Sequence, residues 1–394
     1  MGNMLRLVAI LVSIGLVGMT QGLIVPLLSF ILEQREVSAV FNGISTTALF
    51  FGVIVASPFI ELVVRKYGAK RTILYSTGLA IIMTLAFPIW DNLYAWIVFR
   101  VILGIALSGI FVSTEIWLNT ILTANNRGRM FAFYGLAIAI GLMIGPLGIN
   151  LLSISLWAPF LVSAICYVIP MLITIRIPDE DSWLAEAEEE EGSGVKRWWR
   201  IFWLAPFAML ASLVYGYLDG ALIGQFPIYG SRLDMLPATI SLTLSVFVFG
   251  SIVFQFPLGW LSDLWGRRQT LLLAAVIGMV GFLLLPLAQN NTWMLMTMFF
   301  LVGGALGSFY SLGLAYLGDL LHGNNLTTGN VLYTMLYGVG SIMGPSFTGA
   351  AIQYLGKEWF AWSIAAMLLI YAGYGLFHSQ SIKSKSSSFT TTGN

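Results

Sequence analysis

The sequence predicts an all-α integral membrane protein with 12 transmembrane helices in two pseudo-symmetric six-helix bundles. Of the 394 residues, 58% are apolar and only 9% are charged, a composition that suits lipid rather than water as the surrounding solvent. Apolar runs of about 20 residues or more, the length that spans the hydrocarbon core as a helix, recur along the whole chain. Short motifs also recur at a nearly fixed separation, which indicates an internal repeat.

Twelve apolar runs define the expected spans in chain order. Their approximate bounds are 5–32, 37–64, 71–90, 94–122, 130–152, 156–175, 201–229, 237–264, 270–287, 293–321, 328–355 and 359–377. The first run is far longer than the apolar core of a signal peptide and lacks a small-residue cleavage pattern, so we expect it to remain in the membrane.

Lysine and arginine are distributed unevenly over the loops between these spans. One set of alternate connections, together with both termini, holds fifteen of the nineteen basic residues. The other set holds only Arg35, Arg232 and Lys357, and Arg100 lies inside a span. Because basic residues favour the cytoplasmic side of short loops, both termini are predicted to be cytoplasmic.

The repeat relates the two halves of the chain. Three matched features are separated by 198 or 199 residues. Gly68 corresponds to Gly266, "GLMIGP" at 141–146 corresponds to "GSIMGP" at 340–345, and "MTQG" at 19–22 corresponds to "YLDG" at 217–220. Two six-span bundles, 1–178 and 200–380, are therefore predicted.

The remaining segments are polar. Residues 179–199 are acidic and contain Gly192 and Gly194, which predicts a solvated cytoplasmic linker, with an acidic partner-binding element as the alternative. Residues 381–394 are of low complexity, so a disordered cytoplasmic tail is expected.

Several motifs carry a resemblance to a known family. The stretch "GWLSDLWGRR" at 259–268 resembles the cytoplasmic loop signature of the major facilitator superfamily through Gly259, Leu261, Asp263, Gly266, Arg267 and Arg268. "FRVILG" resembles its fourth-span arginine motif through Arg100 and Gly104, and "GLMIGP" resembles its fifth-span glycine–proline motif. The stretch "STEIWLNTILTANNRGRMFAFY" at 113–134 is similar to the YcaD-like branch of this superfamily.

The first-half copy of the loop signature departs from the family pattern. Aligned on Gly68, Arg65 takes the place of the aspartate and Glu61 the place of the first glycine. The resemblance implies that this aspartate pairs with arginine and latches the outward-open state. We expect Glu61, one helical turn from Arg65, to supply part of the missing acceptor. The alternative is that Arg65 merely follows the preference for basic cytoplasmic loops.

The latch is then expected to depend mainly on the second-half copy. Its predicted members are Asp263, Arg267 and Arg268, with Arg127 or Arg129 from the matching loop of the first half. Glu115, near the cytoplasmic end of the fourth span, is expected to form a gating pair with Arg127 or Arg129. Asp319 at the end of the tenth span is its expected counterpart, and a structural role is the alternative for both acids.

Ionisable residues inside spans are candidates for function because they are unfavourable in lipid. Asp219 is predicted a few residues past the centre of the seventh span, with Gln21 at the equivalent place in the first span. Burial favours the neutral form of a carboxylate, so Asp219 is the expected proton-coupling or substrate-contacting acid. A hydrated carboxylate near the outer mouth is the alternative.

Arg100 and four tyrosines complete the expected cavity. The resemblance implies a cavity-facing charge at Arg100, with snorkelling to the outer headgroups as the alternative. Tyr215, Tyr217, Tyr333 and Tyr337 lie on the seventh and eleventh spans. They could stack on an aromatic or cationic substrate or serve as ordinary packing aromatics.

Glycine and proline are expected to shape two helices. Small residues four positions apart allow close helix contact, and a proline removes a backbone donor and kinks a span. The residues concerned are Gly141, Gly145 and Pro146 in the first half and Gly340, Gly344 and Pro345 in the second. The resemblance associates this motif with proton-driven exporters.

These observations predict a proton-coupled secondary transporter of a small organic molecule, with export favoured over import. The sequence contains no ATP-binding or nucleophile motif, and with one cysteine and two histidines it supports no metal site. We therefore expect no enzyme activity, cofactor or nucleic-acid partner. The expected partners are substrate, protons and lipids, and the expected setting is a monomer in the bacterial inner membrane. A lipid or amphiphile flippase and a non-transporting receptor are the alternatives.

Overall fold

The computed structural model describes residues 2–122, 127–177 and 195–377. This part of the chain is almost entirely helical, which confirms the predicted fold class. The expected tail and most of the expected linker lie outside the described residues.

The two halves have matching element orders. The first half contains α1 (Gly2–Gln34), α2 (Ala39–Tyr67), α3 (Ala69–Ile89), α4 (Leu93–Ile121), α5 (Arg127–Ile144), the 3₁₀ helix η1 (Gly145–Ser153) and α6 (Ala158–Ile175). The short helix α7 (Val195–Leu204) precedes the second half. That half contains α8 (Pro206–Ser231), α9 (Pro237–Trp265), α10 (Arg267–Ala288), α11 (Thr292–Gly307), α12 (Phe309–Leu320), α13 (Asn324–Leu355) and α14 (Trp359–Phe377).

Eleven spans in the described part of the chain are long and apolar enough to cross a membrane. In this count α5 and η1 form one span, and α11 and α12 form another. Helix α13 falls outside it because asparagine, threonine, serine and glutamine side chains make it more polar. With 32 residues it is nevertheless long enough to cross, and it packs along α8 and α2. The expected number of twelve is therefore consistent with the structure.

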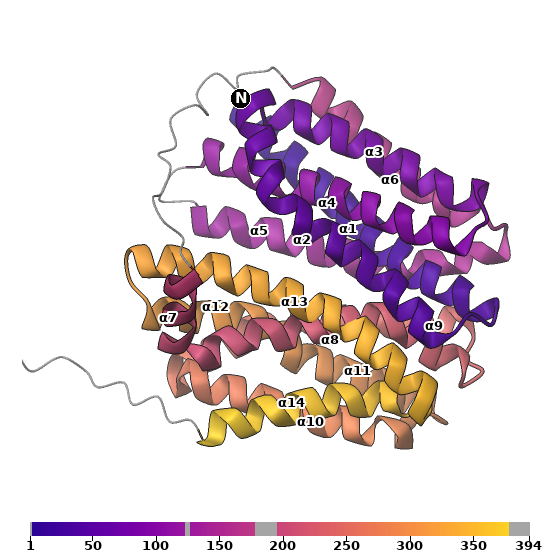
Figure 1. The fold of residues 1–394 in the computed structure, drawn as a ribbon, viewed down its shortest axis with the longest axis vertical. Coiled ribbons are helices and arrows are strands. Elements are labelled where there is room, and N and C mark those ends of the chain that lie inside the picture. The colour runs from indigo at the N-terminus through magenta and orange to yellow at the C-terminus, as the bar shows by residue number, and fades with distance from the viewer. Residues whose placement is uncertain (1, 123–126, 178–194, 378–394) are drawn as a thin grey trace, which may run out of the picture.

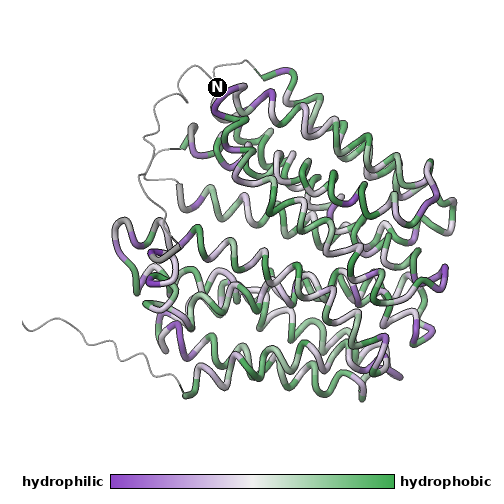
Figure 2. The backbone as a smooth tube through the Cα atoms, viewed as in Figure 1, coloured by the Kyte–Doolittle hydropathy of each residue, from purple (hydrophilic) through white to green (hydrophobic). Residues whose placement is uncertain are grey.

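The helices run roughly side by side, with the first half above the second in Figure 1. We call the end that carries α7 and the α2–α3 and α9–α10 turns the linker side, and the opposite end the far side. Hydrophobic residues follow the lengths of the helices and hydrophilic residues gather at their ends (Figure 2). Helix α7 begins at Val195, inside the range expected for the linker, and lies across the ends of the spans (Figure 1).

Equivalent residues cap equivalent helices in the two halves. Gly68 and Gly266 end α2 and α9 with φ angles of 87° and 96°, a region that glycine adopts readily and other residues do not. The side chain of Asn92 caps α4 by accepting from the backbone N–H of Tyr94, and Asn291 caps α11 by accepting from that of Met294. The repeat seen in the sequence therefore has a local structural basis.

Two glycines of the same loop motif are expected to respond to alanine in opposite directions. Gly266→Ala places a side chain at positive φ and should lower the free energy of unfolding by about 1 kcal/mol. Gly259→Ala, inside α9 with open space around its Cα, should leave it unchanged or raise it by roughly 0.5–1 kcal/mol. Thermal unfolding of the two variants measures the difference. Equal effects would contradict the predicted role of backbone conformation at Gly266.

Glycines bring α1 against α5 and α8 against α13. A methyl group on any of four glycines would lie 2.0 to 2.4 Å from a facing backbone oxygen, with Gly141 against Gly15, Gly145 against Met19, Gly340 against Leu213 and Gly344 against Tyr217. The close approach expected from the glycine spacing is therefore present in both halves.

The two prolines of this motif have different effects. In the first half, α5 ends at Ile144 and the chain continues as 3₁₀ helix through Pro146. In the second half, α13 runs unbroken through Pro345, whose carbonyl accepts a hydrogen bond from Gln225 Nε2 at 3.1 Å. Helix α13 packs along both α8 and α2. At Pro345, where the sequence predicts a second kink, the chain therefore stays α-helical instead of changing to 3₁₀ helix as it does at Pro146.

The two halves meet through polar contacts on the far side. Between α2 and α13, the backbone N–H of Ala39 donates to Gln353 Oε1 at 3.0 Å. Thr47 Oγ1 of α2 donates to the Ile342 carbonyl oxygen at 2.8 Å and lies 2.7 Å from Ser346 Oγ. Between η1 and α9, Asn150 Nδ2 donates to Ser241 Oγ at 3.1 Å. A methyl group on Gly43 of α2 would lie 2.4 Å from the Pro345 carbonyl oxygen. The ribbons of the halves diverge toward the linker side (Figure 1). The structure is therefore closed on the far side.

Candidate functional site

Asp219 lies near the middle of α8 and is half-buried. The hydroxyl of Tyr337 on α13 donates a hydrogen bond of 2.8 Å to its Oδ2 atom. The residue is more central than the sequence indicated, because α7 takes 195–204 and α8 begins only at Pro206. Among the described residues, no lysine or arginine pairs with this carboxylate.

Three tyrosine rings pack against one another beside Asp219, and one of them, Tyr337, bonds to its carboxylate. The rings of Tyr215 and Tyr337 stack with centroids 6.0 Å apart, and Tyr310 of α12 lies 6.0 Å and 5.6 Å from them. Tyr333 extends the group, with its ring 5.0 Å from that of Tyr310 and its hydroxyl bonded to the Tyr310 carbonyl oxygen. We call Asp219, Tyr215, Tyr310 and Tyr337 the aspartate–tyrosine cluster.

Sequence reasoning missed Tyr310 and misplaced Tyr217. Tyr310 follows the helix break at Ser308, and no spacing rule within one helix connects it to Tyr337. Tyr217 is two residues from both Tyr215 and Asp219, so it points to another face of α8. Its hydroxyl lies 3.1 Å from Thr348 Oγ1 in a buried polar chain. Tyr217 therefore lies outside the cluster in the described structure, which favours the packing role.

Glu115 of α4 faces the cluster from the first half. Its side chain is exposed although it lies in a spanning helix, and its carboxylate is within electrostatic range of the phenols of Tyr134 and Tyr310. Arg129 is also exposed, and no ion pair joins it to Glu115 in the described part of the chain. The expected partner Arg127 has a side chain outside the described residues. Gln21 is half-buried in α1 at a depth similar to that of Asp219 in α8.

Arg100 is buried inside the first half, with an exposed fraction of 1%. Its Nη1 atom donates to Thr46 Oγ1 of α2 at 2.8 Å, while its Nε and Nη2 atoms have no partner among the described residues. The adjacent glycine, Gly104, brings α4 against α2, since a methyl group there would lie 2.1 Å from the Leu49 carbonyl oxygen. The side chain therefore neither snorkels to the headgroups nor faces an open cavity in this state.

The linker-side charges of the second half converge on Arg267. Its Nε atom donates to Asp319 Oδ2 at 2.6 Å, and its Nη1 atom lies 3.4 Å from Asp263 Oδ1. Arg268 instead reaches α14, where it donates to the Gly375 carbonyl oxygen. The structure thus unites Asp263, Arg267 and Asp319 as one group, and a gating role for Asp319 as the second-half counterpart of Glu115 stays a prediction.

The first-half copy of this motif contains the pair inferred from spacing. Arg65 Nη2 donates to Glu61 Oε1 at 2.8 Å, within α2 and at its exposed linker-side end. In the second half, Gly259 occupies the position of Glu61 and Asp263 that of Arg65. The charge at these positions is therefore arranged differently in the two halves, and a latching role for Glu61 stays a prediction.

Asp263→Asn is expected to raise the fraction of molecules open to the linker side by no more than about fivefold. The predicted latch acts in the state that is closed on the linker side, whereas the pair with Arg267 in the described state lies within one half. The effect is expected to be small because Asp263 is solvent-exposed and exposed ion pairs contribute roughly 0.2–1 kcal/mol. Reactivity of a cysteine introduced at Thr334, which is exposed on α13, reports the opening when Cys166 is replaced by serine. An unchanged reactivity would remove Asp263 from the latch.

The halves are also joined on the far side by a charged pair that sequence reasoning missed. Arg232, which caps α8, donates through Nε to Glu33 Oε1 of α1 at 2.7 Å. The pair is largely shielded, with exposed side-chain fractions of 13% for Glu33 and 29% for Arg232. The two residues are 199 residues apart, the separation that relates the halves, so opposite charges at equivalent helix ends were a usable signal.

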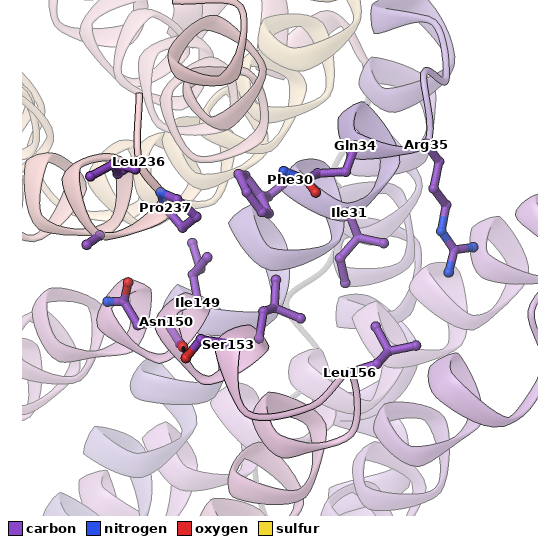
Figure 3. Close-up of a pocket in the computed structure, with 12 residues that line it drawn as sticks. Phe30, Ile31, Gln34, Arg35, Ile149, Asn150, Ser153, Leu156, Leu236 and Pro237 are labelled. Atoms are coloured by element: carbon purple, nitrogen blue, oxygen red, sulfur yellow. Dashed lines mark hydrogen bonds between the residues drawn. The ribbon is translucent and has the colours of Figure 1, made fainter. Parts of the chain in front are cut away.

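A separate pocket of about 620 Å³ opens on the far side between α1, η1 and the start of α9. Phe30, Gln34, Asn150 and Pro237 are among the residues around it (Figure 3). Its charged lining residue, Arg35, forms an ion pair with Asp91. Asp219 lies about three helical turns from the far end of α8, so this pocket is not part of the aspartate–tyrosine cluster. Among the described residues, no group of three or more His, Cys, Asp or Glu side chains could hold a metal ion.

The fold and these motifs are typical of membrane transporters built from two six-helix halves, and comparison with known proteins identifies the family. A sequence profile described as Major Facilitator Superfamily matches residues 10–236 and 208–391. The chain belongs to this superfamily, which confirms the resemblance seen in the sequence, and it is a secondary transporter rather than a member of an enzyme family.

Two bacterial relatives show the branch. An uncharacterized MFS-type transporter, YfkF of Bacillus subtilis (strain 168), is 33% identical over 347 residues, which are 88% of each chain. An uncharacterized MFS-type transporter, YcaD of Escherichia coli O139:H28 (strain E24377A / ETEC), is 24% identical over 345 residues, 86% of this chain and 87% of the relative. The similarity to YcaD inferred from residues 113–134 is thereby confirmed.

Two solved structures share the fold. The nucleoside transporter NupG superposes with a TM-score of 0.70 at 15% identity, covering 95% of this chain and 96% of that one. A bacterial homolog of the human lysosomal transporter Spinster, in an inward-facing and unoccupied conformation, superposes with a TM-score of 0.67 at 16% identity, covering 95% of both chains. At these identities the likeness establishes the fold alone.

Proposed function

We propose that this transporter is proton-coupled and exports a small organic molecule by alternating access. The observation that carries the proposal is Asp219, a half-buried carboxylate in the middle of a spanning helix whose hydrogen-bond partner is the Tyr337 hydroxyl. A carboxylate at that depth is unfavourable while charged and unpaired. Proton binding relieves this penalty, so the two halves can enclose a neutral site more easily than a charged one.

The arrangement of contacts supports one state of an alternating-access cycle. Hydrogen bonds and the Glu33–Arg232 pair close the far side, while the ribbons of the halves diverge toward the linker side (Figure 1) and Glu115 of α4 is exposed. Thr46, the partner of Arg100, is covered by α8, because a methyl group on Gly224 would lie 2.7 Å from Thr46 Cγ2. Opening of the far side would therefore uncover Arg100.

The orientation follows from the basic residues, most of which lie on the linker side. We assign this side to the cytoplasm, so that both termini are cytoplasmic and the described state is open inward. The bacterial plasma membrane is the proposed location, and a monomer suffices because one chain contains both halves. The preference for export rests on the glycine–proline motif, whose tight contacts are present in α5 and α13.

Thermal unfolding in the presence of a library of metabolites, drugs and lipids tests this function. The purified protein and Asp219→Asn are compared at pH 6 and pH 8, with Tyr217→Phe as a control on the same helix. A ligand at a hundredfold excess over its dissociation constant adds about 2.7 kcal/mol of stability. A soluble ligand whose effect depends on pH in the wild type but not in Asp219→Asn is expected. Stabilisation by lipids alone would contradict the proposal and favour a flippase.

A further inference from the structure

We propose that the substrate is an organic cation, bound through the Asp219 carboxylate and the faces of Tyr215, Tyr310 and Tyr337. This inference rests on the proposed function and specifies the substrate class of the same site. It follows from the sign of the charge at the cluster, from the type of surface around it and from the acid across the gap between the halves.

The first argument is the absence of a counter-charge. Among the described residues, the titratable groups of the cluster are Tyr215 on the helix of Asp219, Tyr337 on α13, which bonds to Asp219, and Tyr310 on α12; Glu115 of α4 lies near Tyr310. None of these groups is a cation. Of the arginines in the described structure, Arg100 donates to Thr46, Arg232 pairs with Glu33 and Arg267 pairs with Asp319, so none of these three pairs with Asp219. The charged form of Asp219 therefore needs a cation from outside the protein.

The second argument is the aromatic surface. Tyr215, Tyr310 and Tyr337 are each half-buried and keep part of their surface accessible. The rings of Tyr310 and Tyr337 are nearly perpendicular, at 77°, while those of Tyr215 and Tyr337 are nearly parallel, at 28°. Ring faces in two orientations beside a carboxylate can attract a cation and also cover the apolar groups attached to it.

The third argument is selectivity. Glu115 of the other half places a second acid near Tyr310, so the site opposes anionic substrates by like-charge repulsion. A proton and an organic cation would compete for the same carboxylate, so release of one accompanies binding of the other. This competition couples the two fluxes in opposite directions and accounts for export driven by proton entry.

Equilibrium binding of tetraphenylphosphonium to the purified full-length protein tests the inference. Saturable binding is expected to be up to about tenfold tighter at pH 8 than at pH 6, because protons compete with the cation at low pH. Asp219→Asn should weaken binding at least about tenfold and remove the pH dependence. Tyr310→Leu, which removes the ring face, should weaken it about threefold to tenfold, whereas Tyr310→Phe should have little effect.

Tyr217→Phe is the matched control, because Tyr217 lies on the same helix with its hydroxyl on Thr348, and it should bind as the wild type does. Each variant is used only if it elutes as a single species and unfolds cooperatively. Absence of saturable binding to the wild type, or unchanged binding to Asp219→Asn, overturns the cation assignment. If a neutral or anionic compound then shows binding that depends on pH through Asp219, the proposed function stands and the substrate class is wrong. If no ligand shows such dependence, both are wrong.

Discussion

Asp219→Asn is expected to abolish accumulation of substrate against a gradient while leaving the protein folded. Asparagine keeps the shape of the side chain and can still accept the hydrogen bond of Tyr337, but it cannot bind or release a proton. With one proton exchanged per substrate, one pH unit of gradient supports about tenfold accumulation in the wild type, since a tenfold ratio corresponds to about 1.4 kcal/mol. The variant should reach a ratio of about one.

The measurement uses proteoliposomes and the compound that stabilises the wild-type protein. Gradient-driven accumulation and exchange without a gradient are recorded in parallel, because exchange does not require net proton movement. Asp219→Asn should lose the first and retain the second once the substrate concentration is raised to offset its weaker binding, whereas Tyr217→Phe should retain both. Accumulation by the asparagine variant at the wild-type level would show that another group carries the proton.

Glu33→Gln is expected to shift the protein strongly toward the state that is open on the far side. The substitution leaves Arg232 without its anionic partner in a shielded position where Glu33 is only 13% exposed. Removal of one member of a fully buried pair destabilises by about 3–5 kcal/mol. Partial exposure of Arg232 reduces this, so a change of about 10- to 100-fold in the ratio of the two states is expected.

Distances between spin labels at Ile154 and Asn290, exposed far-side residues of different halves, measure this ratio after Cys166→Ser. The matched control is Asp91→Asn, which breaks the far-side pair with Arg35 within one half and should leave the distances unchanged. Exchange of the two charges, as Glu33→Arg with Arg232→Glu, should restore the wild-type distribution. If Asp91→Asn and Glu33→Gln had equal effects, the Glu33–Arg232 contact would not be the closing element.

The fold could be predicted from the sequence because its determinants are local and repeated. Each apolar run must form a helix in lipid, since every backbone polar group has to be paired within the segment. Gly68 and Gly266 mark equivalent turns because their backbone conformation suits glycine. Helix α13 can be recognised as a span by its place in the repeat, although its polar residues keep it out of a count based on apolarity.

The candidate site could be predicted only in part. The Asp219 position and the tyrosines at 215 and 337 could be found because ionisable and aromatic residues stand out in apolar helices. Tyr310 enters from α12 of the same half and Glu115 from α4 of the other half. Their proximity depends on how separate helices pack, which single-helix spacing does not encode. Conversely, Tyr217 matches its neighbour in type but faces Thr348, because adjacent tyrosines on a helix can have different surroundings.

The central claim is that Asp219 binds and releases a proton in the working pH range, and infrared difference spectroscopy between pH 8 and pH 6 tests it most directly. The account predicts that the carbonyl band of a protonated carboxylic acid appears at pH 6 in the wild type and is missing in Asp219→Asn. Glu115→Gln should retain it. A band that is identical in the wild type and in Asp219→Asn would contradict the account.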